Sequence, residues 1–524
     1  MPPWLLHHHL SRLQTNSDRI HITAMASAAK RSKKLRILLI PFFATSHIRP
    51  FTDFAFHLAA ASPGDVEATV AVTPANAPVV QAALSSHIPR GGHGGDARVK
   101  VTTYAFPNVD GLPPGVENMS TVKAEDAWRI VAAASNEAVM RPAQESLIRT
   151  SSPDAVVTDL HFIWNAGIAA ELGVPCVAFN SGGIFPTLAL WRLTAIEIKD
   201  PAAGGSVTVP QFPGPDISLP VTELPDFLRN QAQVFEFDHG AENRFMVELK
   251  ACLGFAANTF IDLEPEYCEN FIDSGFVKRA YFVGPLSLPP VAAATVAITG
   301  VEKSSSACFD WLDTMPAHSV VYLCFGSLTK LSEAQLNELA VGLESSGVPF
   351  LWVVKVPTWE PPAGWKERVG SRGMLVTGWA PQRDILQHPA VGAFVTHCGW
   401  NSVLETFAAG VPVLTWPMAF EQFIVERFLT QVVSIGERLW PEGAGRRSTR
   451  REEHELVPGE AIARAVAKFM EHGGAADAAR RRVAELSAKA RAAMAEGGTS
   501  HRDLHQLLDD IMAARASGGG TTAP

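Results

Sequence analysis

The stretch "FVTHCGWNSVLE", residues Phe394 to Glu405, brings chemically active side chains close together. His397 and Cys398 are metal ligands in many proteins, and a Cys–His pair can also form a nucleophile. A zinc site is disfavoured because the two residues are adjacent and no second ligand pair follows at zinc-finger spacing. A Cys–His nucleophile depends on partners that meet in space, but no activating motif surrounds Cys398. The third interpretation is a turn that binds an anion.

The flanking residues predict the elements that position this turn. The apolar pattern alternates between strands at 374–379, 392–396 and 411–415 and helices at 382–387, 401–409 and from 421 onward. His397 to Ser402 then form a strand-to-helix turn at the carboxyl edge of a parallel sheet, where a helix N-terminus attracts anions. Gly399 allows close backbone approach, and Asn401 and Ser402 can cap the helix or bind phosphate.

The whole chain repeats this alternation of strands and helices. It starts at Leu35 and starts again at "SVVYLCFGS", which predicts an α/β protein of two Rossmann-like domains with parallel sheets and C-terminal helices. The Gly-rich and charged stretch Gly443–Glu455 is expected to be an exposed loop. We expect a disordered leader or targeting segment at 1–34, a first domain at 35–285, a linker at 286–307, a second domain at 308–515 and a disordered tail at 516–524.

Bulk composition narrows the class of protein. The 524 residues carry a formal net charge of −9 at pH 7, which offers no basic field for nucleic acid. Apolar runs such as "ILLIPFF" are shorter than the ~20 residues of a membrane span. Six scattered cysteines indicate reduced thiols and a cytoplasmic protein. Residues 1–34 have no long apolar signal core, which argues against secretion.

One long block carries a resemblance to a known family. From Trp379 to Gln422 the chain reads W-A-P-Q, I-L-x-H, G-x-F-x-T-H-C-G-W-N-S, then E, G-V-P, W-P and E-Q. This pattern resembles the signature box of plant family 1 UDP-dependent glycosyltransferases, which adopt the GT-B fold of two facing Rossmann-like domains. The segments "ANTFIDLEPE", "VGPL", "WLD" and "SVVYLCFGS" extend the resemblance over nearly the whole chain.

The resemblance implies a role for each residue of the box, although each residue taken alone is equally compatible with a structural role. Trp379 would stack on uracil, with Ala380 and Gln382 against the base and ribose and Glu405 on the ribose hydroxyls. The phosphate ligands would be His397, Asn401, Ser402 and Ser327. The sugar hydroxyls would be read by Trp400, Glu421 and Gln422.

The same resemblance implies a catalytic base. His47, in "SHIRP" just after the first predicted strand, matches the family's catalytic histidine, and Asp159 in "VVTDL" matches its carboxylate partner. An imidazole suits the removal of a hydroxyl proton near neutral pH. Ser181 falls where the family often has a sugar contact. The sequence contains no D-x-D motif and no P-loop, which favours an inverting transferase without metal or cofactor over a kinase or NTPase.

The substrates are less determined by sequence. Gln422 favours UDP-glucose as donor, and we expect a small phenolic acceptor such as a flavonoid, with a terpenoid or hormone as the alternative. Ser46 stands where the family commonly has glycine, which bears on acceptor geometry. The rival interpretation is a non-catalytic UDP-sugar-binding protein, and either protein is expected to be a monomer. Candidate acceptor-wall residues are Phe106, Phe162, Trp164, Phe185, Trp191 and Phe420.

Overall fold

Two parallel sheets organise the chain, as the alternating pattern predicts. The computed structural model describes residues 34–87, 99–196, 198, 205–229, 244–289 and 303–518. The expected leader apart from residue 34, residues 290–302 of the expected linker and residues 519–524 of the expected tail lie outside the described residues. Residues 516–518, which were expected to belong to the tail, are helical.

The first domain is built on a seven-stranded sheet in the order β3-β2-β1-β4-β5-β8-β9. All neighbouring strands in it are parallel. The strands are β1 (Leu35–Ile40), β2 (Val66–Val72), β3 (Lys100–Thr103), β4 (Ala155–Asp159), β5 (Cys176–Asn180), β8 (Gly254–Ala257) and β9 (Ala280–Phe282). A small antiparallel hairpin, β6 (Ser206–Thr208) and β7 (Ser218–Pro220), stands apart from the sheet.

Helices connect these strands. They are α2 (Thr45–Ala61), α3 (Ala77–Ser85), α4 (Ala127–Ser135), α5 (Glu137–Ser151), α6 (Asn165–Glu171), α7 (Ile184–Thr194), α8 (Asp226–Arg229), α9 (Arg244–Ala251) and α10 (Pro265–Asp273). Because both faces of a parallel sheet are covered, its central strands are mostly apolar, and β4 is buried at every position, whereas the edge strand β3 is more exposed.

The second domain has a six-stranded parallel sheet in the order β12-β11-β10-β13-β14-β15. The strands are β10 (Val320–Cys324), β11 (Phe350–Val354), β12 (Gly373–Thr377), β13 (Val391–Thr396), β14 (Val413–Thr415) and β15 (Gly436–Arg438). In chain order this is 3-2-1-4-5-6, the dinucleotide-binding arrangement, whose order reverses between its first and fourth strands. The elements expected around His397 therefore form within a residue or two of the predicted positions.

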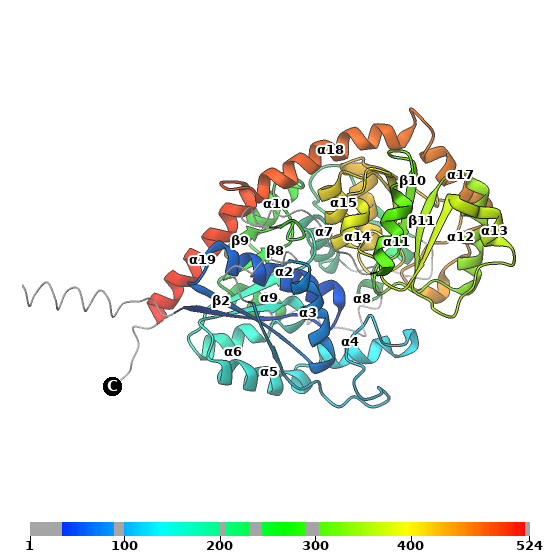
Figure 1. The fold of residues 1–524 in the computed structure, drawn as a ribbon. Coiled ribbons are helices and arrows are strands. Elements are labelled where there is room, and N and C mark those ends of the chain that lie inside the picture. The colour runs from blue at the N-terminus through cyan, green and yellow to red at the C-terminus, as the bar shows by residue number, and fades with distance from the viewer. Residues whose placement is uncertain are drawn as a thin grey trace, which may run out of the picture.

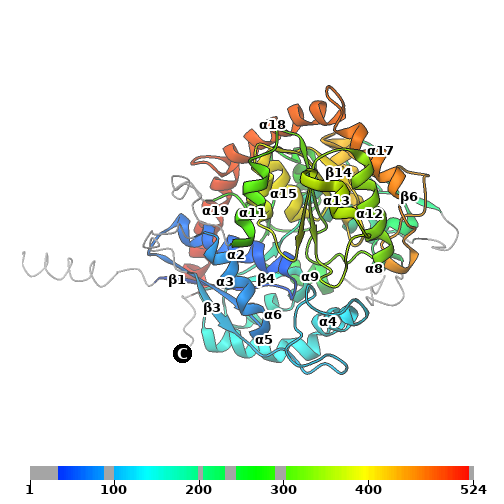
Figure 2. The ribbon, with the colours of Figure 1, turned by 45° about the vertical axis from the view of Figure 1, so that its right-hand side comes forward.

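Helices of the second domain cover both faces of its sheet. They are α11 (Lys303–Leu312), α12 (Glu333–Ser346), α13 (Trp365–Val369), α14 (Gln382–Leu386), α15 (Trp400–Ala409), α16 (Gln422–Arg427) and α17 (Gly459–Phe469). Figure 1 shows α12, α13 and α17 at the end of the second domain away from α5 and α6, and the turn to Figure 2 brings this end forward. Helix α11 begins inside the segment expected to be linker, because Cys308 and Leu312, one turn apart, bury an apolar stripe.

Two long helices end the chain and join the domains. Figure 1 shows α18 (Ala475–Met494) running from the second domain toward the first, where α19 (Thr499–Gly518) follows. Leu504, Leu507 and Leu508 of α19 belong to the same apolar core as strand β1 of the first domain. Within the described part of the chain, no helix combines the length and apolarity that crossing a lipid bilayer would require.

Candidate active site

A large cleft lies between the two domains. Its volume is about 2950 Å³, and residues from both domains line it. In each sheet the strand order reverses at one place, between β1 and β4 in the first domain and between β10 and β13 in the second. Loops that leave the carboxyl ends of strands at such a point diverge to opposite faces and leave a crevice for a ligand. The two crevices contribute side chains to the same cleft.

His47 and Asp159 come from the two strands that flank the first crevice. His47 lies in the first turn of α2, which follows β1, and Asp159 is the last residue of β4. The His47 Nδ1 atom lies 2.8 Å from Asp159 Oδ2, and Phe42 N also donates to that oxygen at 3.1 Å. Burial opposes the charged imidazole, but the Asp159 carboxylate outweighs it and raises the pKa of His47 above 6.5. This pairing suits a general base.

His397 occupies the equivalent place in the second domain. It follows β13, and its side chain is buried. Among the described residues, no atom forms a hydrogen bond with its Nδ1. Burial and the positive charge of Lys355 lower the pKa of His397 to about 3, so the ring is neutral. A Cβ added at Gly326 or Gly399 would come within 2.4 Å of His397 Nε2, so both glycines are needed for the close approach.

The turn after His397 leads into α15. Gly399 is the N-cap of this helix, and no side chain caps it, so the capping role suggested for Asn401 and Ser402 is not seen. The first amide groups of the helix are therefore left for an anion. Cys398 adopts a φ of +65° and is fully buried. Burial raises the pKa of its thiol, which is the opposite of what a nucleophile requires.

The expected uridine end of the cleft is built from α14, α15 and the loop between β12 and α14. The Trp379 indole is 55% exposed, while Ala380 is buried beside it. Gln382 Nε2 donates to Ser402 Oγ at 2.9 Å and to Glu405 Oε2 at 2.7 Å. Burial raises the pKa of Glu405. A planar exposed ring beside a partly buried carboxylate is an arrangement that can bind a base and its ribose.

The remaining candidates also line the cleft. Ser327 follows β10, Ser181 follows β5, and Glu421 and Gln422 stand at the start of α16. The Gln422 Oε1 atom accepts from Met418 N at 2.9 Å and Ala419 N at 3.0 Å, which leaves the amide N–H groups for a ligand. Fourteen of the fifteen expected site residues therefore line the cleft, and the remaining one, Asp159, lies behind His47.

Comparison with known proteins places this geometry in a family. Residues 288–433 match the family model described as UDP-glucoronosyl and UDP-glucosyl transferase. The chain is 33% identical to UDP-glycosyltransferase 73E1 of Stevia rebaudiana over 91% of its own length and 96% of the relative. The chain belongs to the plant family 1 UDP-dependent glycosyltransferases.

Further comparisons agree. UDP-glucose flavonoid 3-O-glucosyltransferase 7 of Fragaria ananassa is 34% identical over 93% of this chain and 98% of the relative. The crystal structure of Glycyrrhiza uralensis UGT73P12, complexed with glycyrrhetinic acid 3-O-monoglucuronide, has 30% identity and a TM-score of 0.77. The superposition covers 93% of this chain and 97% of the UGT73P12 chain. The protein is a glycosyltransferase with the GT-B fold.

In this glycosyltransferase, Trp400 and Asn401 join the domains. Trp400 Nε1 donates to Asn258 O of the first domain at 2.8 Å, and the indole packs against Gly183. The indole N–H is therefore already used within the protein, although Trp400 also lines the cleft as expected from the sequence. Asn401 Nδ2 donates to Ser46 O at 2.7 Å, so this expected phosphate ligand holds the loop beside the base His47.

Three of the expected acceptor-wall residues line the cleft of the glycosyltransferase and three do not. Trp164, Trp191 and Phe420 line it. Phe162 and Phe185 are fully buried, and Phe106 packs against the core. Phe185 contacts Phe428 of the second domain, with ring centroids 5.0 Å apart, because α7 forms part of the domain junction. Apolarity near a strand end does not distinguish a cleft wall from such a junction.

Several cleft residues were missed by the sequence analysis. His161 bonds Asp159, Lys355 donates to Gly326 O, and the Arg49 guanidinium lies 4.5 Å from the centre of the Trp379 indole. His161 follows β4 and Lys355 follows β11, and this position at the carboxyl edge of a parallel sheet is a signal that could have identified them. The ligand atoms of His47, Asp159 and His161 lie within 4.8 Å of one another, a spacing that a cation could bridge. Hydrogen bonds among them already use both carboxylate oxygens.

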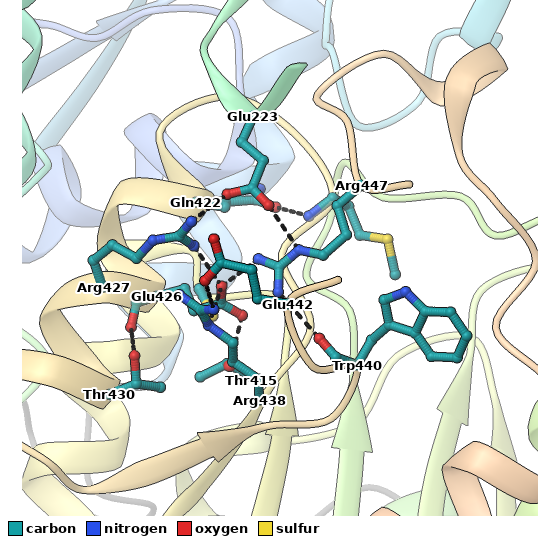
Figure 3. Close-up of polar contacts among 12 residues, drawn as sticks. Glu223, Thr415, Gln422, Glu426, Arg427, Thr430, Arg438, Trp440, Glu442 and Arg447 are labelled. Atoms are coloured by element: carbon teal, nitrogen blue, oxygen red, sulfur yellow. Dashed lines mark hydrogen bonds and ion pairs between the residues drawn. The ribbon is translucent and has the colours of Figure 1, made fainter. Parts of the chain in front are cut away.

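The segment Gly443–Glu455 is exposed at both ends, as expected, but differs from expectation in its middle. It was expected to be an exposed loop, yet Ser448 is buried and Arg447 enters a group of charges between the domains. This charged cluster consists of Glu223, Glu426, Arg427, Arg438 and Arg447. Figure 3 shows Glu223 of the first domain facing Arg427 and Arg447 of the second. The carboxylates of Glu223 and Glu426 explain the burial of the Arg447 side chain, because they compensate its charge.

Proposed function

We propose that this glycosyltransferase moves glucose from UDP-glucose to a hydroxyl of a small lipophilic acceptor, preferably a flavonoid or another phenolic, with inversion at the anomeric carbon. The observation that carries the proposal is that the His47–Asp159 pair of the first domain and the His397 turn of the second meet at one cleft. A base on one domain and an anion-binding helix start on the other are the two parts that a direct displacement needs.

In the proposed reaction the acceptor oxygen attacks the anomeric carbon from the side of the first domain. Its proton passes to Nε2 of His47, and Asp159 stabilises the imidazolium that forms. The bond between the anomeric carbon and the UDP oxygen breaks, and UDP leaves with the electron pair. The neutral imidazole of His397 and the uncapped start of α15 would stabilise the diphosphate charge, so the reaction proceeds without a metal.

The donor assignment rests on the uridine end and on Gln422. Trp379, Gln382 and Glu405 would bind the base and ribose, and Ser327, Asn401 and Ser402 the phosphates. Glu421 and the free amide N–H groups of Gln422 would contact sugar hydroxyls, and Ser181 would add a contact from the first domain. The relative named UDP-glucose flavonoid 3-O-glucosyltransferase 7 supports glucose as the sugar.

The acceptor assignment rests on the first-domain part of the cleft, where Trp164, Trp191 and Leu190 present apolar surface. Such a lining suits an aromatic molecule with few polar groups. A terpenoid or hormone is the competing class, and the Glycyrrhiza structure, which holds glycyrrhetinic acid 3-O-monoglucuronide, favours keeping it in the screen. We also propose that the protein is cytoplasmic and acts as a monomer.

A donor-by-acceptor screen read by mass spectrometry tests the function. We expect UDP-glucose with a phenolic to give a product that gains one hexose, and His47→Ala to lower kcat by about 10²–10⁴-fold. His472→Ala, at a fully exposed histidine, is the matched control and should keep wild-type kcat. Binding of UDP-glucose without a hexosylated product from any acceptor would favour the rival UDP-sugar-binding protein.

A further inference from the structure

Asp159 holds two imidazoles, and the proposed reaction uses only one of them. Its Oδ2 atom pairs with His47 Nδ1 at 2.8 Å, and its Oδ1 atom pairs with His161 Nδ1 at 2.8 Å. Each oxygen also accepts one backbone N–H, from Phe42 and from His161, both at 3.1 Å. Four donors around one buried carboxylate fix its position and orient both rings.

Both rings stand between Asp159 and the cleft. Asp159 is almost fully buried and is not part of the cleft wall, whereas the His47 side chain is 23% exposed and that of His161 is 40% exposed, both in the wall. Each Nδ1 is turned to the carboxylate, so the opposite edge of each ring, which carries Nε2, is turned to the cleft. Within the described ranges, no atom hydrogen-bonds either Nε2. With Nδ1 protonated toward Asp159, each neutral ring offers Nε2 as an acceptor.

A phenylalanine fixes the spacing of this pair. The Phe42 ring stacks on His161, with centroids 4.1 Å apart and an interplanar angle of 19°, and meets His47 edge to face at 5.2 Å. The two imidazole centroids are 5.2 Å apart at 80°. The cleft therefore contains two hydrogen-bond acceptors at a set separation, of which only His47 has a role in the proposed proton transfer.

We propose that His161 binds the acceptor directly, and that the preferred acceptors carry two hydroxyls on neighbouring carbons of an aromatic ring. His47 removes the proton of the reacting hydroxyl, while His161 Nε2 accepts a hydrogen bond from the adjacent hydroxyl. Hydrogen bonds of about 2.8 Å to both rings can be made together only by two oxygens that are close to each other. A lone hydroxyl makes one bond and leaves His161 unused. This inference rests on the proposed function.

The experiment compares a catechol-bearing flavonoid with the analogue that lacks one of the two hydroxyls. We expect wild-type kcat/KM to favour the catechol by about tenfold, the value of one additional hydrogen bond in a desolvated site. In His161→Asn the amide can still donate to Asp159 but no acceptor atom reaches the cleft, so the ratio should fall toward one. His161→Phe, which keeps the stacking on Phe42, should reduce the ratio in the same way. The control His472→Asn, at an exposed histidine, should leave the ratio as in wild type.

Calorimetric binding of both flavonoids without donor distinguishes this inference from the proposed function, because it needs no turnover. Tighter binding of the catechol by wild type, lost in His161→Asn, supports the direct contact even if no hexose is transferred. A catechol preference that persists in His161→Asn would overturn it. So would an equal loss with both flavonoids accompanied by a shifted pH profile, because His161 would then act only through Asp159 and His47.

Discussion

Glu223 of the first domain and Arg427 of the second lie 2.6 Å apart, Oε2 to Nη2, with both side chains almost fully buried. The surrounding charged cluster adds Arg447 Nε at 3.0 Å from Glu223 Oε1 and Arg427 Nη1 at 2.9 Å from Glu426 Oε2. Burial raises the pKa of Glu223, so its ionised form depends on these guanidinium groups. Helix α16, which carries Gln422 and Arg427, is thereby tied to the first domain.

Removing the charge of Glu223 should destabilise the protein strongly. Glu223→Gln leaves Arg427 and Arg447 without a first-domain counter-ion in a buried place, at a cost of about 3–5 kcal/mol in the free energy of unfolding. Urea denaturation followed by tryptophan fluorescence measures it. Glu442→Gln is the matched control, because this carboxylate is 61% exposed while paired with Arg438, and it should cost about 0–1 kcal/mol. An equal loss of unfolding free energy in the two variants would contradict the view that burial makes the Glu223 ion pairs important for stability.

The pH dependence of turnover should report His47. Its pKa is raised because the Asp159 carboxylate stabilises the imidazolium despite burial. A base works unprotonated, so kcat/KM should rise with pH through a midpoint above 6.5. Asp159→Asn removes the negative charge that raises the pKa of His47, while the burial that lowers this pKa remains. The midpoint of the pH profile should therefore move to lower pH, and kcat should fall by about 10²-fold or more. Rate profiles over pH 5 to 9 test this, and an unmoved midpoint would argue against the pairing.

Gly326→Ala should disturb donor binding. Gly326 has a φ of +68°, and a Cβ there would lie 2.3 Å from His397 Nε2, so His397 must shift. Because His397 is the proposed phosphate ligand, a shift of its ring should lower kcat/KM for UDP-glucose roughly 10²-fold. Gly347→Ala is the control, with a φ of +72° but nothing within 4 Å of the added Cβ. It should cost about 1 kcal/mol of stability and no activity. Similar kinetics for both variants would refute the contact.

Trp400→Phe should test the role that the structure gives to this indole. The variant keeps an aromatic ring against Gly183 but leaves Asn258 O without its donor, and we expect about 1–3 kcal/mol lower stability. The preference for UDP-glucose over UDP-galactose should stay as in wild type, because the indole N–H is already used. A collapse of that preference, measured as the ratio of kcat/KM values, would restore the sugar-reading role.

Local pattern predicted much of this molecule. The strands and helices around His397 form within a residue or two of expectation, and the parallel order brings His47 to Asp159 because both follow neighbouring strands. Partners across the domain boundary were not predictable in this way. Periodicity shows which face of an element is apolar, but it does not show what covers that face, so the burial of Phe185 and the bond from Trp400 to Asn258 were missed.

The same limit explains Arg447 and α19. A charged stretch looks solvated unless its counter-ions are known, and those of Arg447 include Glu223, more than 200 residues earlier. The leucines of α19 mark an amphipathic helix, but the sequence does not state that their partner is the core beneath β1. Both features depend on contacts between distant segments, which a reading along the chain does not contain.

The passage of α18 between the domains has a mechanical consequence. The chain crosses once between β9 and α11 and crosses back through α18, so the domains are linked by two separate strands of polypeptide. Two connections limit the relative motion of the domains more than one connection would. Any widening of the cleft to admit a UDP-sugar would also require the ion pairs of Glu223 with Arg427 and Arg447 to break.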